Sequence, residues 1–156
     1  MKIRWIVVGV VSVLLGASGA AAGSYNPLKW IKKSPSPTAS EQLAANKEEE
    51  KKLSLQLQAV LPPRTNLKDA CAGFKNLNDC VAALHVSHNL KIKFNCLKWD
   101  VTGAKPAGDV KSCAAPSNAK AMDLSKAIRE LKPDANSRTE AKSAEKRARE
   151  DIKDAM

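Results

Sequence analysis

Four cysteines constrain the fold of this chain more than any other feature of its sequence: Cys71, Cys80, Cys96 and Cys113. They are even in number and lie within one stretch of the chain. In an oxidising compartment such a set predicts two disulfide bonds, although four cysteines allow three connectivities. The interpretation therefore depends on whether the chain leaves the reducing cytoplasm.

The first residues have the three parts of a secretory signal peptide. Lys2 and Arg4 form a short positive start, residues 5–15 form an apolar run, and residues 16–23 are only Gly, Ala and Ser. This order predicts export, and with it an oxidising environment for the cysteines.

The expected cut follows Ala20-Ala21-Ala22, which supplies the small side chains that signal peptidase needs, and leaves Gly23 as the new N-terminus. The alternative is an uncleaved membrane anchor. The apolar core of about eleven residues disfavours it, because a spanning helix needs about 20. We therefore expect residues 1–22 to be a signal peptide and the mature protein to be periplasmic or secreted, or membrane-anchored if the signal is not cleaved.

Local helix signals favour one disulfide pairing. Cys71 is expected to end a short helix and Cys80 to lie in the first turn of the next. Gly73 and Asn76, between them, indicate a tight reversal of the chain. This reversal brings the two sulfurs within reach and favours a bond between Cys71 and Cys80.

The remaining two cysteines would then form the second bond. Cys96 and Trp99 share one face of an expected helix. A bond from Cys96 to Cys113 would draw residues 103–118 over Trp99 and bury its ring.

A metal site is the alternative use of these side chains. Imidazole and thiolate groups bind zinc, but the spacing from Cys71 to Cys80 is far from the short spacings of zinc fingers. A helical wheel places His88 on an apolar face with Leu77, Val81 and Leu84, and it places His85 at the edge of that face. A histidine at the edge of the core is therefore the favoured interpretation, and we expect neither a metal nor another cofactor.

The chain is basic, with a net charge of +10, of which Lys2 and Arg4 account for two. The remaining +8 raises the question of a nucleic-acid partner. Export argues against one, because genomic DNA is not in the destination compartment. Anionic envelope components remain as partners: lipid headgroups, lipopolysaccharide or acidic polysaccharide. The plain alternative is a charge that serves solubility alone.

Aromatic residues are scarce, so the core must consist mainly of Leu, Val, Ile and Ala. No long alternating run of β-branched residues predicts a sheet. The expected fold class is therefore all-α: a small disulfide-stapled helical bundle with a long charged C-terminal helix.

Capping residues locate the expected helices. Thr38 and Glu41 have the spacing of a capping box and predict a helix that runs to about Leu61, with a solvated first half. Shorter helices are expected over residues 67–72, 77–89, 93–102 and 124–132, with Asn66, Asn76 and Asp123 as caps of the first, second and fourth. Residues 103–121 contain several Gly and Pro and are expected to be a loop.

The last helix is expected to begin with a capping box from Ser137 to Glu140 and to run to about Ala155. Its apolar stripe is almost entirely alanine, so we expect it to pack lightly, to project, or to pair with a partner helix. Two charged pairs with a spacing of four would support it locally: Arg147–Asp151 and Lys146–Glu150.

These signals divide the chain into four parts. They are a signal peptide over residues 1–22, a flexible linker over 23–38, a helical domain with two disulfides over 39–132, and a charged C-terminal helix over 133–156.

The linker contains a short amphipathic stretch that could touch a membrane surface. Trp30 and Ile31 lie among three lysines, Lys29, Lys32 and Lys33. Such a stretch can place apolar groups in the interface and lysines on headgroups. An ordinary spacer is the favoured alternative, and membrane contact is expected only through the leader or residues 28–33.

Motifs of catalysis are missing from the sequence. It contains no Gly-rich phosphate loop, no GxSxG elbow, no HExxH and no Cys-x-x-Cys. We therefore expect a protein that is not an enzyme and that has no catalytic residues.

One longer pattern resembles a known group of proteins. The run from Cys80 to Leu90, with Cys71-Ala-Gly-Phe74 before it and Leu131-Lys-Pro-Asp-Ala135 after it, is similar to exported helical proteins of acidobacterial type. The resemblance covers residues 40–155. It implies export and a shared domain, and it implies no mechanism, because the group has no established activity.

The sequence thus favours an exported, non-enzymatic binding or scaffolding protein of the bacterial envelope, with an unknown ligand. The alternative is a periplasmic metal-binding or metal-sensing protein that uses His85 and His88 with cysteine thiols.

Overall fold

The computed structural model describes residues 36–107, 110–113 and 120–156. The expected signal peptide lies outside the described residues, as do the five residues of the expected membrane contact, Lys29, Trp30, Ile31, Lys32 and Lys33. The described residues form seven α-helices and no strand, so the all-α fold class is confirmed. The helices are α1 (Ala39–Ala45), α2 (Lys47–Gln56), α3 (Leu67–Cys71), α4 (Leu77–Leu90), α5 (Phe94–Thr102), α6 (Leu124–Leu131) and α7 (Ser137–Ala155).

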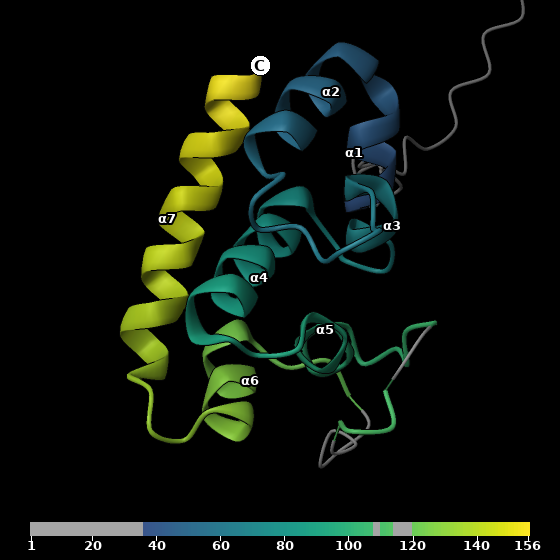
Figure 1. Ribbon diagram of the computed structural model, residues 1–156. Helices are drawn as coiled ribbons and strands as arrows, with labels where there is room; N and C mark the ends of the chain where they lie inside the picture. Colours follow the sequence, from purple (N-terminus) through teal and green to yellow (C-terminus); the bar gives the residue numbers. More distant parts are fainter. Residues whose placement is uncertain (1–35, 108–109, 114–119) are drawn as a thin grey trace, which may run out of the picture. The chain divides into compact units, whose positions relative to one another are not determined.

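Helix α4 forms the centre of the bundle, and α1, α3, α5, α6 and α7 all pack against it (Figure 1). Every residue from Cys80 to Val86 is buried. A helix that is apolar on all sides must be covered on all sides. The run Cys-Val-Ala-Ala-Leu-His-Val therefore determines which helix the others surround.

Three helices begin at the caps that the sequence predicts. Asn66, Asn76 and Asp123 accept hydrogen bonds from the backbone N–H groups of Asp69, Asp79 and Lys126, respectively, and start α3, α4 and α6. Each bond satisfies a backbone donor that the first turn of a helix leaves without a partner.

The prediction of one continuous helix from Thr38 to about Leu61 is wrong. The capping box at Thr38 is present, but the helix breaks at Asn46. The Asn46 side chain accepts hydrogen bonds from the N–H groups of Glu48 and Glu49 and so caps a new helix. This break turns the chain, so that the first half of the segment also reaches the core through Leu43, which is buried. The second helix, α2, ends at Gln56.

The expectation that the C-terminal helix packs lightly is also wrong. Helix α7 makes its most extensive contacts with α4 and packs further against α6 and α2. Its buried residues are Ala141, Ala144, Ala148 and Ala155. Small side chains let two helix backbones approach closely, so an alanine stripe can hold a helix in place even though each residue buries little area.

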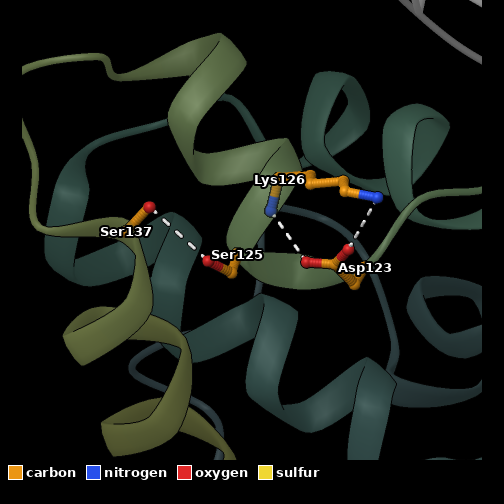
Figure 2. Close-up of polar contacts among 4 residues, drawn as sticks. All are labelled: Asp123, Ser125, Lys126 and Ser137. Atoms are coloured by element: carbon orange, nitrogen blue, oxygen red, sulfur yellow. Dashed lines mark hydrogen bonds and ion pairs between the residues drawn. The ribbon is translucent and has the colours of Figure 1, made fainter.

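The start of α7 differs by one residue from the predicted capping box. Asn136 is the cap, and its side chain accepts a hydrogen bond from the N–H of Thr139. Ser137 is therefore the first helical residue, and its hydroxyl lies 3.5 Å from that of Ser125 in α6 (Figure 2). The same view shows Asp123 binding both the backbone N–H and the ammonium of Lys126, which fixes the start of α6.

Both predicted disulfides are confirmed. Cys71 is bonded to Cys80 and Cys96 to Cys113. The expectation that the second bond buries Trp99 is wrong, because this side chain is half-buried. Lys105, from the predicted covering segment, places its Nζ 5.6 Å from the centre of the indole ring, so an exposed cation lies over the ring and leaves it partly accessible. The two bonds indicate a non-reducing environment.

Gly103 is the residue that lets the chain leave α5. It has a φ of +71°, and a Cβ at this position would lie 2.6 Å from the backbone nitrogen of Ala121. The positive φ and the close approach both require glycine. Among the described residues, no helix is long and apolar enough to cross a membrane.

Candidate functional site

The two histidines lie in different surroundings, and their burial is the reverse of the predicted burial. His85 is buried, whereas His88, predicted on the apolar face, is exposed. His85 Nε2 lies 2.6 Å from Asp151 Oδ2, which joins the central helix α4 to α7. Asp151 therefore contacts His85 and not the predicted Arg147, while the predicted pair of Lys146 and Glu150 forms at 3.8 Å.

The residues of the metal-site alternative do not come together. All four cysteines are in disulfides, so no free thiol accompanies His85 and His88. Within the described part of the chain, no group of three or more His, Cys, Asp or Glu side chains is arranged to hold a metal ion. Only the two histidines remain from the proposed ligand set, and Asp151 already binds one of them.

The described part of the protein contains an apolar groove of about 780 Å³. It lies between α1, α2, the start of α4 and the end of α7, and we call it the apolar groove. Its lining includes the apolar side chains of Leu43, Leu53, Leu77, Ile152 and Met156. A groove of this size and lining is typical of sites for small apolar or amphiphilic ligands.

Helix α1 is held in place by backbone groups at the start of α4. The N–H of Ala39 donates to the carbonyl of Phe74 at 3.2 Å, and the N–H of Leu77 donates to the Gln42 side chain. The Gln42 amide in turn donates to the carbonyl of Pro37. The first two bonds attach α1, which forms part of the groove wall, to the segment that leads into α4.

The opposite walls of the apolar groove carry opposite charges. Glu41, Glu49 and Glu50 lie on the α1 and α2 side, and Arg149 and Lys153 lie on the α7 side. Two of the acids are engaged, because Glu41 accepts from Thr38 and Glu49 accepts from the Asn46 amide at 2.6 Å. Glu50 is the half-buried acid of this wall that these caps do not use.

A polar atom without a partner lies at the same groove. Asn78 lines it, and the Oδ1 atom of Asn78 is buried with no hydrogen-bond partner. A buried acceptor of this kind costs roughly 1–3 kcal/mol when it is left unsatisfied. A ligand that donates a hydrogen bond to Asn78 would recover this free energy, which gives the groove one polar recognition point.

A second unusual polar group lies at the other end of the bundle, in α5. Asp100 is only 2 % exposed. Burial, with a smaller contribution from the nearby negative charge of Glu130, raises its pKa to about 6. The backbone carbonyl of Asp100 accepts from the N–H of Met122. The folded protein thus keeps a carboxyl group that is half protonated near mildly acidic pH.

This carboxyl predicts a loss of stability as the pH rises. The folded-state pKa of about 6 exceeds the ordinary 3.8, so the folded protein binds the proton more tightly. The gain is fully present below about pH 4 and disappears as the pH rises through about 6. We expect the free energy of unfolding to fall by on the order of 2 kcal/mol across this window. Urea unfolding of the wild type and of Asp100→Asn measures it.

The asparagine variant should be more stable than the wild type near neutral pH and should lose most of the pH dependence between about pH 4 and 7. Asp154→Asn changes an exposed acid and is the control, which should follow the wild-type profile. Identical profiles for the wild type and Asp100→Asn would show that the carboxyl does not titrate in this range.

The residues of the apolar groove were not identified as a site from the sequence. They come from segments as far apart as Pro37 and Met156, and no local spacing connects them. The sequence offered little signal for Asn78, which is the second residue of α4, two positions after the cap Asn76, in a first turn that also carries Asp79. The prediction that His85 and His88 act together was based on their spacing along one helix. Such local spacing gives no information about the position of α7, which supplies the actual partner of His85.

Comparison of the chain with models of protein families, with curated proteins and with solved structures finds no match. The candidate site therefore depends on its own geometry.

Proposed function

We propose that this protein is an exported, non-enzymatic binding protein of the bacterial envelope, and that the apolar groove holds a single-chain zwitterionic amphiphile. The main support for this proposal is the groove itself, because it combines apolar lining residues with charged residues of both signs. The two disulfides support export, since such bonds persist outside reducing compartments.

The size of the groove favours a small ligand over a partner helix. Its volume of about 780 Å³ is within the range of small-molecule sites, roughly 300–1,000 Å³. An acyl chain would cover Leu43, Leu53 and Ile152, and each buried CH₂ contributes about 0.8 kcal/mol. A chain of ordinary lipid length therefore suffices for measurable affinity.

The charges of the walls favour a head group with both signs. A phosphate would face Arg149 and Lys153 on α7, and an ammonium would face Glu50 on α2. The ammonium or a neighbouring hydroxyl also supplies the donor that Asn78 Oδ1 lacks. Phosphoethanolamine has all of these groups, and we therefore choose lysophosphatidylethanolamine as the probe.

The proposal predicts that the purified protein binds lysophosphatidylethanolamine below its micelle-forming concentration. Ala45→Trp is expected to weaken this binding at least about tenfold. The indole would fill groove volume and exclude about two CH₂ groups of the ligand. Isothermal titration calorimetry measures the affinity, and a fatty alcohol of equal chain length shows the contribution of the head group.

Each variant has a matched control. Ala44→Trp places the same indole on α1 at an exposed position outside the groove. Arg149→Glu and Arg147→Glu change two exposed arginines of α7, and only Arg149 lines the groove. Equal affinities within each pair, or no binding by the wild type, would contradict the proposal. Cleavage of the recovered probe would contradict a non-enzymatic role.

A further inference from the structure

A second hollow, separate from the apolar groove, lies between α3 and α5. Its volume is about 730 Å³, and we call it the basic cleft. Its walls are the turn before α3, one face of α5 and the segment that follows α5. Three cations line it, one from each of these segments: Arg64, Lys98 and Lys105.

One acid, Asp69, lies at the basic cleft, and it is already engaged. The Asn66 amide donates to Asp69 Oδ2 at 2.6 Å, as part of the cap of α3. Three cations and one acid leave an excess of two positive charges around the cleft. A charge excess in a concave site concentrates anions more strongly than the same charges on a convex surface.

Lys98 is the least exposed of the three cations. It is half-buried, and its ammonium donates to the backbone carbonyl of Asp69 at 3.0 Å. Burial lowers the pKa of Lys98, and the charge of Asp69 opposes this effect only in part. An ammonium that is held out of water interacts more strongly with a bound anion than an exposed one does.

The cleft also contains groups that suit a sugar. Asn95 lies on the same face of α5 as Lys98, and its amide can both donate and accept hydrogen bonds. Thr65 adds a hydroxyl, and Phe94 and Pro106 add apolar surface. Sugar rings present hydroxyl groups at their edges and C–H groups on their faces, so they use both kinds of surface.

We propose that the basic cleft binds an acidic saccharide, with its acid groups on Arg64, Lys98 and Lys105 and its hydroxyls on Asn95 and Thr65. The site is independent of the amphiphile proposed for the apolar groove.

Three small probes test this proposal on the purified protein by isothermal titration calorimetry. Digalacturonate has both the sugar and the acid groups. Its methyl ester keeps the sugar and removes the charges, and inorganic phosphate keeps a charge and removes the sugar. We expect digalacturonate to bind at least about tenfold more tightly than either comparison probe, with an affinity that falls as salt is added.

Lys105→Glu is expected to weaken the binding of digalacturonate at least about tenfold, because it reverses a charge at the cleft. Lys68→Glu reverses the charge of an exposed lysine on α3 that does not line the cleft, and it should change the affinity less than about twofold. Arg64→Asn is a second variant. Arg64 has a φ of +61°, a conformation that asparagine tolerates, so this variant should stay folded.

Equal binding of phosphate and digalacturonate would reduce the cleft to a general anion site and overturn the saccharide assignment. Equal binding of the methyl ester would overturn the role of the cations. Equal effects of Lys105→Glu and Lys68→Glu would place the ligand elsewhere.

Discussion

Replacement of Ala148 by leucine is expected to reduce the free energy of unfolding by about 2–3 kcal/mol. Ala148 has no exposed surface and lies in the middle of α7, whose most extensive contacts are with α4. Leucine adds three carbons where the helices are in contact. Because protein interiors are close-packed, α7 would have to move away from α4 or adopt strained rotamers.

Arg147→Leu is the matched control for this prediction. It places the same side chain one residue earlier on the exposed face of α7, and arginine and leucine have similar helix propensities. Its effect should remain within about 0.5 kcal/mol. Urea unfolding followed by circular dichroism compares the two variants. If Ala148→Leu is as stable as Arg147→Leu, the alanine stripe does not hold α7 against α4.

The predictions that the structure confirms depend on local chemistry. Asn66, Asn76 and Asp123 start helices because a short polar side chain satisfies a backbone N–H within its own turn. The bond between Cys71 and Cys80 follows from two of these helix boundaries. Such signals are contained in a few consecutive residues and can therefore be recognised without a structure.

The predictions that failed concern choices between competing local signals or contacts between distant segments. The sequence around Asn46 is compatible with a continuous helix, and the break is favoured because it buries Leu43 as well as Leu53. The burial of His85 depends on Asp151, which is 66 residues away. A helical wheel of α4 alone shows one apolar face, whereas the structure buries every residue from Cys80 to Val86.

The candidate sites show the same limit. The apolar groove joins α1 and α2 to the end of α7, and the basic cleft joins a turn, one face of α5 and the segment after it. Neither the groove nor the cleft corresponds to a motif in the sequence. Five of the scattered lysines and arginines line these two hollows: Arg149 and Lys153 line the groove, and Arg64, Lys98 and Lys105 line the cleft.

Removal of the Cys71–Cys80 bond is expected to have the largest effect of any change considered for this protein. The double variant Cys71→Ala/Cys80→Ala should lose about 3–5 kcal/mol of stability. Release of the loop accounts for about 3 kcal/mol of this loss. The rest comes from the cavity that forms, because both cysteines are completely buried. If the free energy of unfolding of the wild type is of the usual size, about 5–15 kcal/mol, the double variant would keep only part of it.

Comparison with Cys96→Ala/Cys113→Ala separates these two contributions. The two bonds span 9 and 17 residues, so loop entropy alone would make the loss of the Cys96–Cys113 bond more costly by about 0.5 kcal/mol. Burial reverses this order, because Cys113 is half-buried and its removal leaves little cavity. Urea unfolding of both double variants should therefore show the greater loss for Cys71→Ala/Cys80→Ala. The opposite order would mean that the two disulfides stabilise this bundle mainly by restricting the unfolded chain, and that the packing of Cys71 and Cys80 around α4 contributes little.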